Sequence, residues 1–153
     1  MSLIARRLMP ADAEAYKAIR MEGLVNEPSA FGSSLAEEAE QPNGYWTDRL
    51  GKNFMFGLFE DEALLGVAGF YLEGMEKVRH RAHLIGVYLR PAARGKGAGQ
   101  LLLQAVIEEA RQKANQLRLA VTTDNEPARR LYERIGFVVY GTDPRGLGVG
   151  DRF

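Results

Sequence analysis

The sequence lacks cysteine altogether, although it is 153 residues long. This absence excludes disulfide frameworks, thiol nucleophiles and zinc sites built on cysteine. No apolar stretch approaches the roughly 18 residues of a membrane span, and the N-terminus lacks the apolar core of roughly 7–15 residues that a signal peptide carries. The 2 histidines have no clustered carboxylates beside them, so no metal site is expected. We therefore expect a cytoplasmic protein without a membrane partner or a bound metal.

A net charge is also missing, because 20 Lys+Arg balance 20 Asp+Glu. The balance is uneven along the chain: residues 1–76 carry 6 basic and 13 acidic side chains, whereas residues 77–153 carry 14 and 7. Such an asymmetry hints at an anionic ligand on the basic side. A nucleic acid is not the expected ligand, because the neutral chain lacks basic residues interleaved with aromatic ones. The length and the 46% hydrophobic content suit a single domain over residues 1–153.

Hydrophobic periodicity predicts the order of the secondary structure elements. Strands are expected at 2–8, 53–59, 63–71, 80–89, 117–121 and 137–140, and helices after Asp12, at 43–50, at 97–114 and at 128–135. This order predicts an α/β (α+β) fold with a mixed, mostly antiparallel central sheet and helices on both faces. Residues 141–153 contain four glycines and one proline, and we expect them to be a flexible tail.

Several positions are assigned to a face or an environment by the same patterns. The helix after Asp12 is expected to keep Ile19 and Leu24 inside and Arg20 outside. Residues 29–42 are expected to form an irregular, solvated loop with three acidic side chains, Glu37, Glu38 and Glu40. Strict alternation in the strand 80–89 places one set of residues on one face, namely His83, Ile85, Val87 and Leu89. The opposite face then receives Leu84, Gly86 and Tyr88.

The most informative segment joins the strand at 80–89 to the longest helix and contains Gly95, Gly97 and Gly99. Unpaired N–H groups at a helix start carry the positive end of the helix dipole, and glycines let the backbone approach a ligand closely. Together these features predict a phosphate cradle. Arg90, Arg94 and Lys96 add positive charge, with no acidic residue near them in sequence.

Two familiar phosphate loops do not match this segment. The P-loop requires Gly-Lys followed by Ser or Thr, and no Gly-Lys in the chain has that neighbour. The dinucleotide pattern G-x-G-x-x-G would begin at Gly95 and meets Gln100 in place of its third glycine. A glycine-rich connector without a ligand remains the alternative interpretation.

Two ordered motifs resemble the GNAT superfamily of N-acetyltransferases. The first is Arg94-x-x-Gly97-x-Gly99, and the second is Asn125-x-x-Ala128-x-x-Leu131-Tyr132-x-x-x-Gly136-Phe137. A helix and a strand separate them, as in that family, and the resemblance covers roughly residues 3–142. It implies the GNAT fold and acetyl-CoA as co-substrate. It also implies transfer of the acetyl group to a primary amine, carried by a small molecule or a peptide, by direct attack.

The resemblance also implies roles for individual residues. The cofactor-binding set would be Val87, Leu89, Arg94, Gly95, Lys96, Gly97, Ala98, Gly99 and Asn125. Tyr132 would be the general acid that protonates the departing thiolate, and its alternative is a core tyrosine. His83 would be the general base, because the ordinary histidine pKa near ~6.5 suits that work, and its alternative is a hydrogen-bonded strand histidine.

The acceptor side and the end of the chain are less defined by sequence. The acidic segment 29–42 would be a solvated loop or would attract a cationic amine, and Tyr45 and Trp46 would line the acceptor pocket or pack in the core. The family's closing strand is expected to be missing or short and irregular, and a second subunit could cover that sheet edge in a homodimer. The alternative function is a non-catalytic CoA-binding or regulatory module of the same fold.

Overall fold

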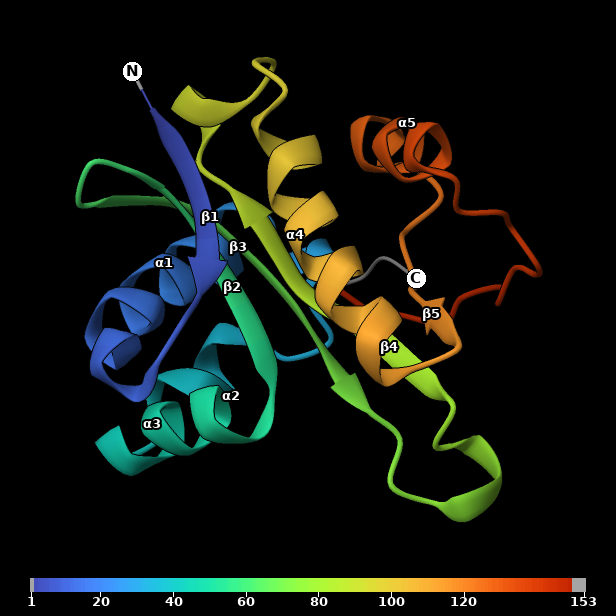
Figure 1. The fold of residues 1–153 in the computed structure, drawn as a ribbon, viewed down its shortest axis with the longest axis horizontal. Coiled ribbons are helices and arrows are strands. Elements are labelled where there is room, and N and C mark those ends of the chain that lie inside the picture. The colour runs from blue at the N-terminus through green and yellow to red at the C-terminus, as the bar shows by residue number, and fades with distance from the viewer. Residues whose placement is uncertain (1, 150–153) are drawn as a thin grey trace.

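The fold is known from a computed structural model, which describes residues 2–149. Its centre is a five-stranded sheet in the order β1-β2-β3-β4-β5, antiparallel from β1 to β4 and parallel between β4 and β5 (Figure 1). The strands are β1 (Leu3–Arg7), β2 (Phe54–Glu60), β3 (Ala63–Leu72), β4 (Arg81–Leu89) and β5 (Gln116–Arg118). The α-helices are α1 (Ala13–Asn26), α2 (Leu35–Ala39), α3 (Asn43–Lys52), α4 (Ala98–Lys113) and α5 (Glu126–Ile135). The predicted mixed, mostly antiparallel sheet is confirmed.

Helices cover both faces of the sheet, as the sequence predicted (Figure 1). On one face, α1 and α3 bury a cluster that includes Tyr16, Ile19 and Trp46. The indole of Trp46 is 1% exposed and packs edge-on against the ring of Tyr16, so Trp46 is a core residue. On the other face, α4 packs against β2 and β3 and lies beside α5.

The segment after α5 differs from the prediction. Residues 137–140 were expected to form a strand, but they are not paired with any described strand, and Val138, Val139 and Tyr140 are 86%, 67% and 78% exposed. The neighbouring strand β5 ends at Arg118 instead of residue 121. A strand needs a hydrogen-bonded neighbour, and hydrophobic alternation alone does not provide one. Residues 141–149 are irregular, whereas 150–153 lie outside the described residues, so the flexible tail stays a prediction.

The acidic segment 29–42 contains a short helix and a buried charge, and both findings correct the prediction. Helix α2 begins with a capping box, in which the Ser34 hydroxyl accepts from the Glu37 N–H and the Glu37 carboxylate accepts from the Ser34 N–H. Glu38 pairs with Arg20 of α1, and the two side chains are 3% and 4% exposed. The expected outward position of Arg20 is therefore wrong. Its partner lies on another helix, which helical periodicity cannot reveal.

Strand β4 does not alternate strictly, because it contains a bulge at Gly86. The register with β3 shifts between Val67 and Gly69, and Gly86 has φ +62, a value that glycine adopts readily. As a result Leu84 and Val87 both face α4, whereas Ile85 and Tyr88 face α1. The prediction that Ile85 and Val87 share a face is wrong, and one extra residue explains the reversal.

Candidate active site

The glycine loop (residues 94–99) joins the end of β4 to the start of α4. Gly95 and Gly97 have φ +77 and +75, and a Cβ added at either would meet nothing within 4 Å. Gly97 is the N-cap of α4, and no side chain caps the helix. The N–H groups of the first turn are therefore free for a ligand at the positive end of the helix dipole. This is the open backbone geometry that a phosphate cradle requires.

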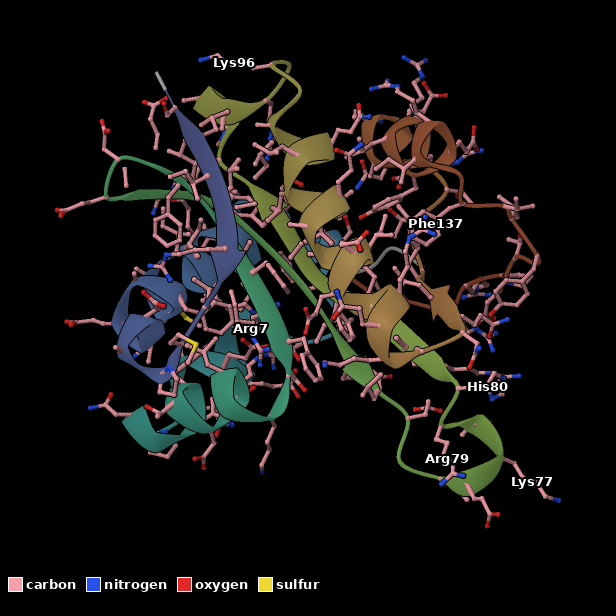
Figure 2. All side chains as sticks on the ribbon, in the orientation of Figure 1. Arg7, Lys77, Arg79, His80, Lys96 and Phe137 are labelled. Atoms are coloured by element: carbon pink, nitrogen blue, oxygen red, sulfur yellow. The ribbon has the colours of Figure 1, made fainter. Side chains whose placement is uncertain are left out.

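The start of α4 is held in place by packing on its inner side. Ala98 is 2% exposed, and a Cβ at Gly99 would lie 3.1 Å from the Leu131 Cδ2 of α5. Gly99 thus permits close contact between α4 and α5. Lys96, in contrast, projects from the loop away from the body of the protein (Figure 2). No ion pair to Lys96 is present within residues 2–149.

The two arginines beside the glycine loop have acidic partners on α1, although none is near them in sequence. Arg90 Nε lies 3.2 Å from Glu22 Oε1, and Arg94 Nη2 lies 2.6 Å from Glu27 Oε1. Arg94 Nε also donates to the Leu89 carbonyl at 2.9 Å. Arg94 therefore clamps the loop to the end of β4 and to α1. Lys96 is left as the loop cation without such a partner in the described chain.

Tyr88 extends the connection between β4 and α1. Its hydroxyl donates to Glu22 Oε2 at 2.8 Å and accepts from Asn26 Nδ2 at 3.2 Å. A Cβ at Gly23 would come within 3.1 Å of the Tyr88 ring, so this glycine lets α1 approach the strand closely. Burial, together with the Glu22 carboxylate, raises the pKa of Tyr88. The C-terminal half of α1 is thus fixed against the strand that leads into the glycine loop.

The edge of β4 that faces β5 is mostly unpaired within the described chain. Strand β5 pairs with β4 only at Arg81, Ala82 and His83, and the two strands separate after that point. Val87 and Leu89 lie beyond the separation, with their side chains packed toward α4. The main-chain groups on this edge are available to an extended ligand, in the way that a further strand would use them.

Tyr132 occupies the inner face of α5, a position that suits the alternative of a core tyrosine, and its role as general acid stays a prediction. It is 8% exposed, belongs to the cluster beneath α4 and packs edge-on against Phe137 with ring centroids 5.8 Å apart. Within residues 2–149 its hydroxyl has no hydrogen-bond partner. Burial raises the pKa of Tyr132 to about 12, so the phenol keeps its proton at neutral pH.

Asn125 stands at the N-cap of α5. Its side-chain Oδ1 accepts from the Ala128 N–H at 3.4 Å, which ties the asparagine to the start of the helix. The spacing of the second motif therefore has a local structural cause: the cap and the buried face of one helix. Contact of Asn125 with a cofactor stays a prediction.

His83 lies on the face of the sheet opposite Tyr132. Its neighbours Ala82 and Leu84 point to the α4 side, and its ring stacks on Tyr71 of β3 at 4.9 Å between centroids. His83 Nε2 is buried without a hydrogen bond, and it lies 3.8 Å from Glu73 Oε1. The sequence analysis did not identify Tyr71 and Glu73 as neighbours of His83. The register of β3 and β4 pairs Tyr71 with His83, and counting residues back from the turn between these strands could have indicated that pair.

Other site types find little support in the described chain. Within residues 2–149, no group of three or more His, Asp or Glu side chains is placed to hold a metal ion. None of the helices in that range is both long enough and apolar enough to cross a membrane. A hollow of about 210 Å³ lies at the far end of α4, between Ala110 and Leu117. It does not include the glycine loop, so the backbone geometry locates the candidate site and the hollow does not.

Comparison with known proteins gives consistent results. A model of the acetyltransferase (GNAT) family matches residues 21–137. The mycothiol acetyltransferase of Streptomyces scabiei is 31% identical over 133 residues, which are 86% of this chain and 41% of that protein. The chain spans about half the length, or less, of the curated relatives it matches.

Solved structures extend the likeness to the fold. A GNAT-family acetyltransferase from Streptococcus pneumoniae has a TM-score of 0.84 and 24% identity, with 98% of this chain and 92% of that chain covered. The yncA protein of Salmonella typhimurium, solved with acetyl-CoA, has a TM-score of 0.75 and 22% identity, with 92% and 82% covered. At these identities the structures support the fold alone.

Proposed function

This chain belongs to the GNAT family of acetyltransferases, and from that premise we propose that it transfers an acetyl group from acetyl-CoA to a primary amine. One observation carries the proposal. The open backbone of Gly95 and Gly97, at the uncapped start of α4, continues directly from the unpaired edge of β4. This arrangement suits a ligand with a polyphosphate at one end and an extended amide-bearing arm at the other.

The cofactor-binding roles follow from what each group can donate or accept. The N–H groups of residues 95–99 would hold the pyrophosphate, and Lys96 would add its charge. Main-chain groups at Val87 and Leu89 would pair with the pantetheine arm. Arg94, whose side chain is bound to Glu27 and the Leu89 carbonyl, would keep the loop in position. Asn125 would act on the same side, at the start of α5.

The chemistry requires one proton acceptor and one donor. Acetyl-CoA supplies a thioester carbonyl to which the amine nitrogen bonds as the C–S bond breaks. His83 would take the proton that the amine loses, because an alkyl amine with a pKa near ~10.4 attacks only in its neutral form. Tyr132, neutral at physiological pH, would act as the general acid toward the departing sulfur. The Tyr132 pKa of about 12 exceeds the pKa near ~8.5 of a typical thiol. Donating a hydrogen bond to the thiolate is therefore easier for the phenol than transferring its proton completely.

The two catalytic candidates lie on opposite faces of the sheet, next to the edge where β4 and β5 separate. A cofactor arm along that edge would pass between them. The acceptor amine would then approach from the face of His83, which is the face that α1 and α3 cover. Glu38 cannot attract it, because Arg20 already neutralises that carboxylate. A small-molecule or peptide amine, cytoplasmic location, homodimer formation and the lack of a nucleic-acid partner remain parts of this proposal.

The test is an acetyl-transfer assay that follows release of the free thiol. Purified protein is incubated with acetyl-CoA and a panel of amines that includes amino acids, polyamines, peptide N-termini and aminoglycosides. We expect amine-dependent release with at least one class, and a lower kcat for Tyr132→Phe with the KM for acetyl-CoA unchanged. Binding of acetyl-CoA without release for any amine would contradict the enzyme and favour the non-catalytic module.

A further inference from the structure

A histidine, a tyrosine and a glutamate meet where β3 and β4 run side by side. Tyr71 is the direct cross-strand partner of His83, and their rings are stacked with an angle of 15° between the planes. Glu73 follows the end of β3, where its N–H donates to the Arg81 carbonyl and fixes the backbone. The imidazole thus stacks on an aromatic ring and has a carboxylate 3.8 Å from its Nε2.

The geometry distinguishes the two imidazole nitrogens. His83 Nε2 is buried and has no hydrogen bond, and the Glu73 carboxylate oxygen lies 3.8 Å away. A buried N–H without a hydrogen-bond partner costs free energy. A normal N–H···O hydrogen bond would need the nitrogen and the oxygen to be about 2.9 Å apart. The side chain of Glu73 is 32% exposed, so a rotation of the carboxylate could shorten its distance to Nε2. In that arrangement Nε2 would donate its hydrogen to the carboxylate, and the lone pair would remain on Nδ1.

The other charged group beside the imidazole is occupied. On β5, Arg118 is in register with His83, and it is the nearest cation from that strand. Its guanidinium lies over the ring of Tyr140 at 4.7 Å and donates to the Tyr140 hydroxyl. From β3 the imidazole meets Tyr71 and Glu73. Glu73 is thus the carboxylate that faces the imidazole.

We propose that Glu73 is a positioning residue for His83: it accepts the Nε2–H hydrogen bond and so presents Nδ1 to the acceptor amine. The inference rests on the proposed acetyl transfer for the role of the base. In that step the amine nitrogen gives its proton to Nδ1, and the resulting imidazolium releases a proton to solvent before the next turnover. The Glu73 carboxylate stabilises the imidazolium by its charge and does not take up the proton.

The first test is spectroscopic and does not depend on activity. The protein has 2 histidines, so ¹⁵N-resolved NMR at mildly alkaline pH detects two imidazole side chains, and His80→Gln assigns them. We expect a slowly exchanging Nε2–H on His83 that disappears in Glu73→Ala. It should persist in Glu73→Gln, because the amide oxygen still accepts. An Nδ1–H tautomer of His83, or a signal indifferent to Glu73→Ala, would overturn the proposal.

The second test is a double-mutant cycle on kcat/KM. His83→Ala should lower kcat/KM by about 10²-fold or more, and Glu73→Ala by about tenfold. In the His83→Ala background, Glu73→Ala should have less than a twofold effect, because it acts through the imidazole. Glu76→Ala, an exposed acid on the same connection, is the matched control. If Glu73→Ala lowered kcat/KM by the same factor in wild type and in His83→Ala, the positioning role would be overturned. An inactive wild type with the expected NMR signal would contradict only the proposed function.

Discussion

Removing either partner of the Arg20–Glu38 pair should destabilise the protein strongly. Arg20 Nε and Nη2 donate to the two carboxylate oxygens of Glu38 at 2.8 and 2.7 Å, and both side chains are nearly inaccessible to solvent. The guanidinium also lies 4.5 Å from the centre of the Phe31 ring. Truncation of one partner leaves the other charge buried and unpaired, which costs about 3–5 kcal/mol. For a chain of this size that loss corresponds to a fall in Tm of roughly 6–20 °C.

The double replacement should behave differently from the single ones. Arg20→Met with Glu38→Leu exchanges the pair for apolar side chains of similar volume, and such exchanges are near neutral or stabilising by about 1–4 kcal/mol. Urea unfolding of wild type, Arg20→Met, Glu38→Leu and the double variant measures all four free energies of unfolding. Single variants that lose less than about 1 kcal/mol, or a double variant as unstable as their sum, would refute the reasoning.

Three further predictions follow from the site and its surroundings. The pKa of Glu38 is lowered, because burial raises it but the hydrogen bonds and charge of Arg20 outweigh burial. The stability that the Arg20–Glu38 pair contributes is therefore present above about pH 4.3 and is lost as pH falls through the pKa of folded Glu38. The double variant should therefore lose less free energy of unfolding than wild type as the pH is lowered. Lys96→Ala should raise the Kd for acetyl-CoA, with less effect at high salt and no change in Tm. Arg94→Ala should also lower Tm, because it removes the ion pair with Glu27 and the hydrogen bond to the Leu89 carbonyl. Equal changes in Tm for the two variants would contradict the structural role of Arg94. Gly97→Ala should cost about 1–2 kcal/mol because of its φ of +75, whereas Gly44→Ala, inside α3 with open space around it, should be neutral or stabilising; calorimetry that finds no difference would contradict the strain.

Part of this site could be predicted from the sequence, because it depends on interactions between residues close together in the chain. The glycine loop depends on contacts within a short segment, so the order of strand, glycine turn and long helix around it was predicted correctly. The partners of the charged residues were not predictable in this way. Arg94 meets Glu27, 67 positions earlier, and Arg20 meets Glu38 on another helix. Such pairs depend on how α1 packs against the sheet, which periodicity does not specify.

Strand irregularities set the second limit on sequence-based prediction. Alternation assigned Ile85 and Val87 to one face, but the bulge at Gly86 reverses the pattern midway through β4. An isolated glycine in a strand pattern is a known signal of a bulge, and that signal could have been used. For residues 137–140 the composition favours a strand, yet Val138 remains exposed because no described strand lies beside it to pair.

Thermal unfolding with and without acetyl-CoA tests the central claim most directly. A ligand that binds only the folded state at 100 times its Kd adds about 2.7 kcal/mol to the free energy of unfolding. We expect a concentration-dependent rise in Tm of wild type, and a smaller rise for Lys96→Ala at the same acetyl-CoA concentration. An unchanged Tm at millimolar acetyl-CoA would contradict the assignment of the glycine loop as the cofactor site.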